Sequence, residues 1–128
     1  MRLLVHVEGQ TERDFVNEVL RDHLVSKGYD SVSARIPGDA GTQRGGIRSW
    51  SSVRRDITNH LKGDSGCIAT TIVDYYGLPK EGDRAWPGRA KAAHLRPTDK
   101  ATHVEDALAA DVATAMGSRF EPRQSSLL

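Results

Sequence analysis

The sequence has 128 residues, enough for one hydrophobic core, and therefore predicts a single domain. Its 18 basic and 17 acidic residues give a net charge of +1, so the composition lacks the strong positive field of many nucleic-acid-binding proteins. A single cysteine excludes an internal disulfide. The sequence shows neither a charged and then apolar leader nor an apolar run of about 18 residues, so we expect a cytoplasmic protein without a membrane span.

The first third of the sequence predicts a strand, a helix and a second strand. Residues 1–7 contain an apolar run and are expected to form a short buried strand. Residues 12–27 are expected to form an amphipathic helix, which Thr11 can cap through its hydroxyl. Residues 29–36 alternate apolar and polar side chains, which indicates a strand. The expected apolar face of the helix consists of Phe15, Val19, Leu20 and Leu24.

The remaining sequence continues the alternation of helices and strands. Residues 37–46 hold five glycines and prolines and predict a loop, and residues 47–62 have apolar side chains at helical spacing. Residues 67–73 predict a third strand, residues 80–100 a long surface loop, and residues 104–116 a third helix. Strands joined by helices favour parallel pairing, so we expect a small three-layer α/β domain with a mainly parallel central sheet flanked by helices.

Two acidic residues each follow a predicted strand. Glu8 comes directly after the first strand, and Asp74 comes directly after the third. The carboxyl ends of parallel strands meet at one edge of a sheet, which is where open α/β sheets bind their ligands. Mg²⁺ is commonly held by one or two carboxylates together with water and substrate phosphate. The two acids therefore predict a metal site at this edge, although an acid after a strand also serves as a turn former or helix cap.

The segments around these acids carry a resemblance to a known family. Residues 8–12 (EGQTE) and 74–79 (DYYGLP) resemble the motifs of a Toprim-like family of bacterial proteins of unknown function, related to the Toprim nuclease domains of the overcoming-lysogenisation-defect proteins. The resemblance covers most of the chain. It implies a Toprim-like domain over residues 1–120 and a divergent or truncated tail over residues 121–128.

The resemblance also implies an activity. Toprim domains hold Mg²⁺, or Mn²⁺, through acidic side chains during phosphodiester chemistry, so the resemblance implies Glu8 and Asp74 as metal ligands and Glu8, Asp74 and Glu12 as catalytic residues. The expected substrate is DNA or RNA. Relatives are commonly encoded beside ATPases and are associated with defence against phage, which implies an ATPase partner subunit.

Two departures from the family pattern leave a second function open. Tyr76 stands where a standard Toprim domain has its second aspartate, and the sequence after Phe120 lacks the final acidic motif of the relatives. A chain that kept the fold but lost these acids would be a non-catalytic interaction or regulatory subunit.

Basic residues suggest where nucleic acid could bind. Arg44 and Arg48 precede or begin the second helix, and Arg84, Arg89 and Lys91 surround Trp86 in the segment expected to be a loop. A solvated helix face or a partner interface explains the same residues.

Because a three-strand sheet offers limited apolar area and leaves exposed edges, we also expect a homo- or hetero-oligomer. The five histidines lack a zinc-like spacing among themselves, so none is assigned to a metal.

Overall fold

The computed structural model describes residues 1–37 and 48–117 of the chain. The elements in order are β1 (Arg2–Val7), α1 (Gln10–Phe15), the π-helical turn η1 (Val16–Leu20), α2 (Arg21–Ser26), β2 (Ser31–Arg35), α3 (Trp50–Gly63), β3 (Cys67–Ile72), the 3₁₀ turns η3 (Tyr75–Gly77) and η4 (Gly82–Arg84), α4 (Arg89–Ala92) and α5 (Pro97–Met116). Among the helices of the described ranges, none is both long enough and apolar enough to cross a membrane. The tail expected from residue 121 onward lies outside the described residues.

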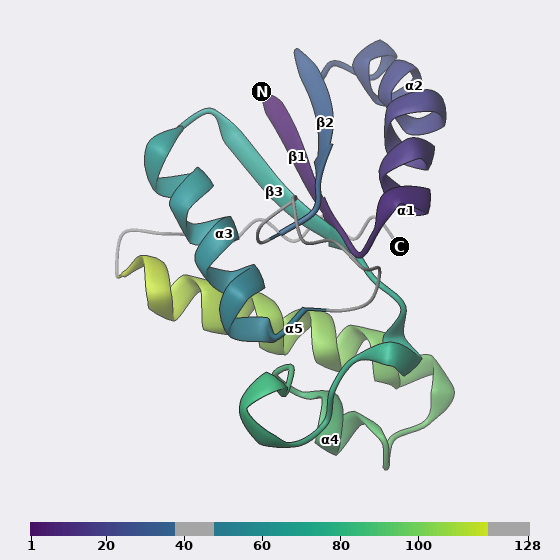
Figure 1. Cartoon of the computed structure of the whole chain (residues 1–128), viewed down its shortest axis with the longest axis vertical. Coiled ribbons are helices and arrows are strands. Elements are labelled where there is room, and N and C mark those ends of the chain that lie inside the picture. The colour runs from purple at the N-terminus through teal and green to yellow at the C-terminus, as the bar shows by residue number, and fades with distance from the viewer. Residues whose placement is uncertain (38–47, 118–128) are drawn as a thin grey trace.

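The three strands form one parallel sheet in the order β2-β1-β3. β1 is central, and its register pairs Val7 with Ile72 of β3. The chain therefore leaves β1 and β3 at neighbouring positions along the same edge of the sheet, where Glu8 and Asp74 follow (Figure 1). The predicted α/β fold, with a parallel central sheet flanked by helices, is confirmed.

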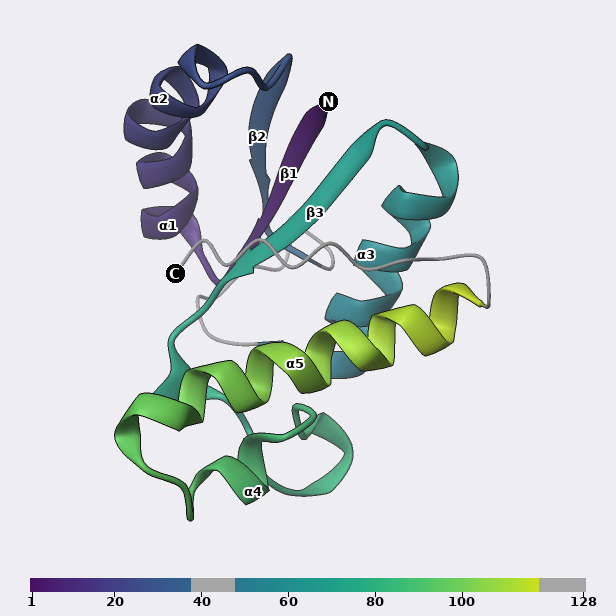
Figure 2. The same cartoon turned by 180° about the vertical axis from the view of Figure 1, so that it is seen from behind.

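Each face of the sheet has its own core, with α1 and α2 on one side and α3 and α5 on the other (Figures 1 and 2). Alternation along β1 sends Leu3, Val5 and Val7 into the first core, against Val16 of the helix. The second core is built around α3, α4 and α5 and includes Trp50, Val53, Trp86, Val104 and Leu108. The intervening residues of β1 face α3. One of them is His6, which lies beside Asp56 of that helix.

The first helix differs from its prediction in its start and in its buried face. It begins at Gln10 with Gly9 as the capping residue, so the expected cap by Thr11 is wrong. Phe15 and Val19 are exposed, which is also contrary to the prediction. The buried face instead follows Val16, Leu20 and Leu24. These three positions recur every four residues, a spacing that drifts around an ideal α-helix, and the π-helical turn η1 keeps them on the sheet side.

The segment 80–100 is not the long surface loop that the sequence predicted. It contains η4, α4 and the first turn of α5, which begins at Pro97. Proline is favoured at this position because its missing N–H is not needed in the first turn. Trp86, expected to be an exposed aromatic, is only 2% exposed and packs against Trp50 with ring centroids 5.0 Å apart. This segment is therefore part of the second core.

Gly88 makes a close contact that predicts a sensitive position. Its backbone has φ of +77°, and a Cβ there would lie 2.9 Å from the Cβ of Ala107 on α5 and 3.3 Å from the carbonyl of His103. We expect Gly88→Ala to lower the free energy of unfolding by about 2–4 kcal/mol, through both backbone strain and overpacking. Chemical denaturation measures this change.

The matched control is Gly82→Ala. Gly82 has nearly the same φ, +76°, but a Cβ there meets no atom within 4 Å, so only the backbone strain remains, about 1–2 kcal/mol. Equal losses in the two variants would contradict the close packing of Gly88 against α5.

Candidate metal centre

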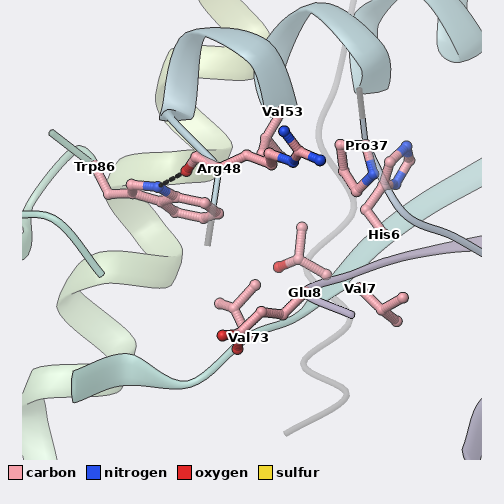
Figure 3. A pocket seen from close by; sticks show the side chains of 9 residues that line it. His6, Val7, Glu8, Pro37, Arg48, Val53, Val73 and Trp86 are labelled. Carbon is pink, nitrogen blue, oxygen red and sulfur yellow. Dashed lines mark hydrogen bonds between the residues drawn. The ribbon is translucent and has the colours of Figure 1, made fainter. Parts of the chain in front are cut away.

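Glu8 lies at the end of β1 and lines a shallow pocket between the sheet edge and α3 (Figure 3). The pocket is also lined by His6, Arg48, Val53, Thr71 and Trp86. Figure 3 shows the Glu8 carboxylate beside Val73 on one side of this pocket, with Arg48 reaching across the opposite side. Glu8 is half-buried, so its carboxylate is accessible to a ligand while a rigid strand fixes its position.

Asp74 lies next to Glu8. Its backbone N–H is close enough to the Glu8 carboxylate to lower the pKa of Glu8, and the pairing of Val7 with Ile72 places the ends of β1 and β3 side by side. The Asp74 side chain is exposed and accepts a hydrogen bond from the backbone N–H of Tyr76 at 3.1 Å through Oδ1. Asp74 therefore caps the turn η3, as the alternative explanation of this acid expected, and its second oxygen takes no part in that bond.

The electrostatics of Glu8 indicate an acidic cluster at this edge. Partial burial raises the pKa of Glu8, the negative charges of Glu12 and Asp74 raise it further, and the N–H of Asp74 opposes them. Glu12 belongs to the first turn of α1, and a Cβ on Gly9 would lie 3.6 Å from its carboxylate. Glu8 is therefore repelled by both of the other acids predicted from the sequence, and a bound cation would relieve this repulsion.

The predicted nucleic-acid-binding residues have different environments. Arg48 lines the same pocket as Glu8, and Arg84 and Lys91 are exposed. Arg89 does not fit the prediction, because it is only 3% exposed and its guanidinium donates to the carbonyl and the hydroxyl of Tyr75, each at 3.1 Å. It also stacks on the Tyr75 ring at 4.1 Å, so it supports the turn after Asp74. Arg44 lies outside the described residues.

A second group of polar residues lies on the α3 face of the sheet. His6 is 1% exposed, and its Nε2 is 3.2 Å from Oδ2 of Asp56. Nε2 of His60 is 3.8 Å from the same oxygen, and Arg35 donates from Nε to both Asp56 oxygens at 3.0 and 2.8 Å. Burial would raise the pKa of Asp56, but His6 and Arg35 outweigh it and hold this pKa well below its usual range. Burial also lowers the pKa of His60.

The sequence did not indicate this second group, because its five histidines show no zinc-like spacing among themselves. Asp56 and His60 are four residues apart on α3 and therefore lie on one face of the helix. A carboxylate and an imidazole at this spacing can indicate a metal site. Two donors are too few for this inference, and the third, His6, comes from the sheet. The proximity of His6 to these two residues depends on the tertiary packing of α3 on β1.

Comparison with curated proteins and with solved structures found no match. A family model described as "Domain of unknown function (DUF4276)" matches residues 7–125. The match begins at the last residue of β1 and includes Glu8, Glu12 and Asp74 as well as the segment that forms α5. Since it covers most of the 128 residues, the chain belongs to the DUF4276 family.

Proposed function

We propose that this chain is a Mg²⁺-dependent, nuclease-like subunit of Toprim type that cleaves phosphodiester bonds of DNA or RNA. The observation that carries the proposal is the contact between the ends of β1 and β3. The backbone N–H of Asp74 lies near the Glu8 carboxylate, and the negative charges of Asp74 and Glu12 both act on Glu8. Acids whose negative charges raise the pKa of Glu8 at an accessible sheet edge are a suitable donor set for a hard divalent cation.

The residues of the edge would have distinct roles in this function. Glu8 and Asp74 would hold Mg²⁺ or Mn²⁺, which supplies an activated water and stabilises the charge that develops on the phosphoryl oxygens. Glu12, on the first turn of α1, would add negative charge beside Glu8 and serve as a further acid-base group. Arg48 lies across the pocket from Glu8 and offers a cation to a phosphate of the substrate backbone. Arg84 and Lys91 are further exposed cations on the neighbouring segment.

A specific observation favours a second candidate, a non-catalytic interaction subunit. By the resemblance, Tyr76 stands in the place of the second Toprim aspartate, and its aromatic side chain is 76% exposed. Exposed tyrosines often anchor protein interfaces. In either function we propose an assembly, with another copy or with an ATPase subunit, within anti-phage defence.

A cleavage assay tests the proposed function and separates the two candidates. Supercoiled DNA and single-stranded RNA are incubated with the full chain, alone and with the product of a neighbouring ATPase gene, in Mg²⁺, in Mn²⁺ and in EDTA. Cleavage that requires the metal supports the nuclease. Stable association with the ATPase subunit without cleavage under any metal condition favours the interaction subunit and contradicts the nuclease.

A further inference from the structure

The group formed by His6, Asp56 and His60 is a second candidate for metal binding, independent of the acids at the sheet edge. One donor atom from each residue lies within 4.8 Å of the others. His6 comes from β1, while Asp56 and His60 come from α3, so the group joins the sheet to the helix that covers it. Two imidazoles and one carboxylate are a donor set that suits borderline divalent ions such as Zn²⁺ and Co²⁺.

The spacing of the donor atoms is that of ligands around one ion. Zn–N and Zn–O bonds of about 2.0–2.2 Å in a tetrahedron place neighbouring donors about 3.3 Å apart. His6 Nε2 is 3.2 Å from Asp56 Oδ2, and His60 Nε2 is 3.8 Å from it. A small movement of the half-exposed His60 would bring the third donor to the same separation.

The orientation of His6 turns its Nε2 toward Asp56, at 3.2 Å from Oδ2, without hydrogen-bond geometry. Nδ1 lies 3.3 Å from the carbonyl of Thr70, which can only accept, so Nδ1 carries the hydrogen in that contact. In the neutral ring the lone pair is then on Nε2, which is fully buried and has no partner with hydrogen-bond geometry among the described residues. A histidine bonded to a backbone carbonyl through one ring nitrogen is the usual arrangement when the other nitrogen binds a metal.

Arg35 sets the charge of the group. Its Nε contacts both oxygens of Asp56, which orients the carboxylate but also places a positive charge beside the proposed ion. If Arg35 stays hydrogen-bonded to Oδ1 of Asp56, Oδ2 of the same carboxylate is left for the metal. We therefore expect weaker binding than at a structural zinc site, in which the positive charge of the metal is not opposed.

We propose that His6, Asp56 and His60 bind one divalent transition-metal ion of the Zn²⁺ and Co²⁺ type. Three protein ligands would leave a further coordination position for water. This proposal does not depend on the proposed Mg²⁺ site, because it uses different ligands and a different class of metal.

Co²⁺ titration of the full chain after treatment with EDTA and dialysis tests the proposal. We expect binding of one Co²⁺ with the visible absorption of a tetrahedral site and displacement by Zn²⁺. His60→Gln, which changes a partly exposed side chain, should weaken binding by about 100-fold or more. His23→Gln changes an exposed histidine that is also helical and should bind like the unmodified protein. Glu8→Gln should also leave Co²⁺ binding unchanged, which separates this site from the proposed nuclease.

A second measurement requires no substitution. Zn²⁺ should shift the ring nitrogen-15 resonances of His6 and His60 while leaving those of His23, His94 and His103 unchanged. Absence of Co²⁺ binding, equal binding by His60→Gln, or shifts confined to the three other histidines would each overturn the proposal.

Discussion

Glu8→Gln and Asp74→Asn are each expected to lower Mg²⁺-dependent cleavage by about 100-fold or more. Changing a residue that only supports a metal ligand costs up to about 100-fold, so the loss of a ligand itself should cost at least as much. Each substitution keeps the shape of the side chain and removes the charge that attracts the cation. The Gln side chain can still accept the N–H of Asp74, so the junction between β1 and β3 should persist. Cleavage of a labelled oligonucleotide over a range of Mg²⁺ concentrations measures the loss.

The fold should tolerate the change at Glu8. Its raised pKa means that the folded state disfavours the ionised carboxylate, so this group contributes stability at acid pH that is lost as the pH rises through its folded pKa. At neutral pH a neutral glutamine should therefore be no less stable in the absence of metal. Thermal unfolding in EDTA checks this expectation.

Matched variants distinguish a metal ligand from general loss of negative charge. Glu105 is exposed on α5 and Asp22 is exposed on α2, so Glu105→Gln and Asp22→Asn should cleave normally. Glu12→Gln should have a smaller effect than Glu8→Gln if Glu12 mainly acts through the helix start and through the charge on Glu8. Full metal-dependent cleavage by both Glu8→Gln and Asp74→Asn would refute the assigned ligands.

Arg89→Ala is expected to lower the free energy of unfolding by about 3 kcal/mol or more. The substitution removes a buried side chain that donates to the carbonyl and hydroxyl of Tyr75 and leaves both groups without this partner. It also removes the stacking contact with the Tyr75 ring and leaves a cavity beneath α4. Lysine cannot reproduce the two-point contact of a guanidinium, so Arg89→Lys should restore little stability.

Lys91→Ala is the matched control, because Lys91 is an exposed cation on the same short helix. It should change the free energy of unfolding by less than about 0.5 kcal/mol and, if α4 contacts nucleic acid, weaken that binding. Denaturation with urea compares the two variants. Similar stability of Arg89→Ala and Lys91→Ala would contradict the buried role of Arg89.

The sequence was sufficient to predict the parts of the fold that depend on local patterns. The apolar run of β1, the alternation in β2 and the helical spacing in α3 predicted the parallel arrangement, and the acids after β1 and β3 predicted that Glu8 and Asp74 lie at one edge. These features follow from strand and helix periodicity and from the position of acids at strand ends. These parts of the fold could be predicted without knowing any contact between residues that are distant in the sequence.

The features that were missed depend on tertiary contacts. The turn η1 changes which residues of the first helix are buried, so Phe15 is exposed and Val16 is buried. Residues 80–100 have no regular apolar period, because Trp86 and Arg89 are buried by packing around α4 and α5 and not along one helical face. The proximity of His6 to α3 likewise arises only when the helix covers the sheet.

The position of a bound Mn²⁺ ion shows directly whether Glu8 and Asp74 hold a divalent metal. A crystal of the full chain grown with Mn²⁺ and measured near the manganese absorption edge gives an anomalous difference map that locates the ion without reference to activity. We predict a peak coordinated by the carboxylates of Glu8 and Asp74 at the shared edge of β1 and β3, and its loss in Glu8→Gln. Manganese bound elsewhere in the chain, with no peak between these two carboxylates, would contradict the account.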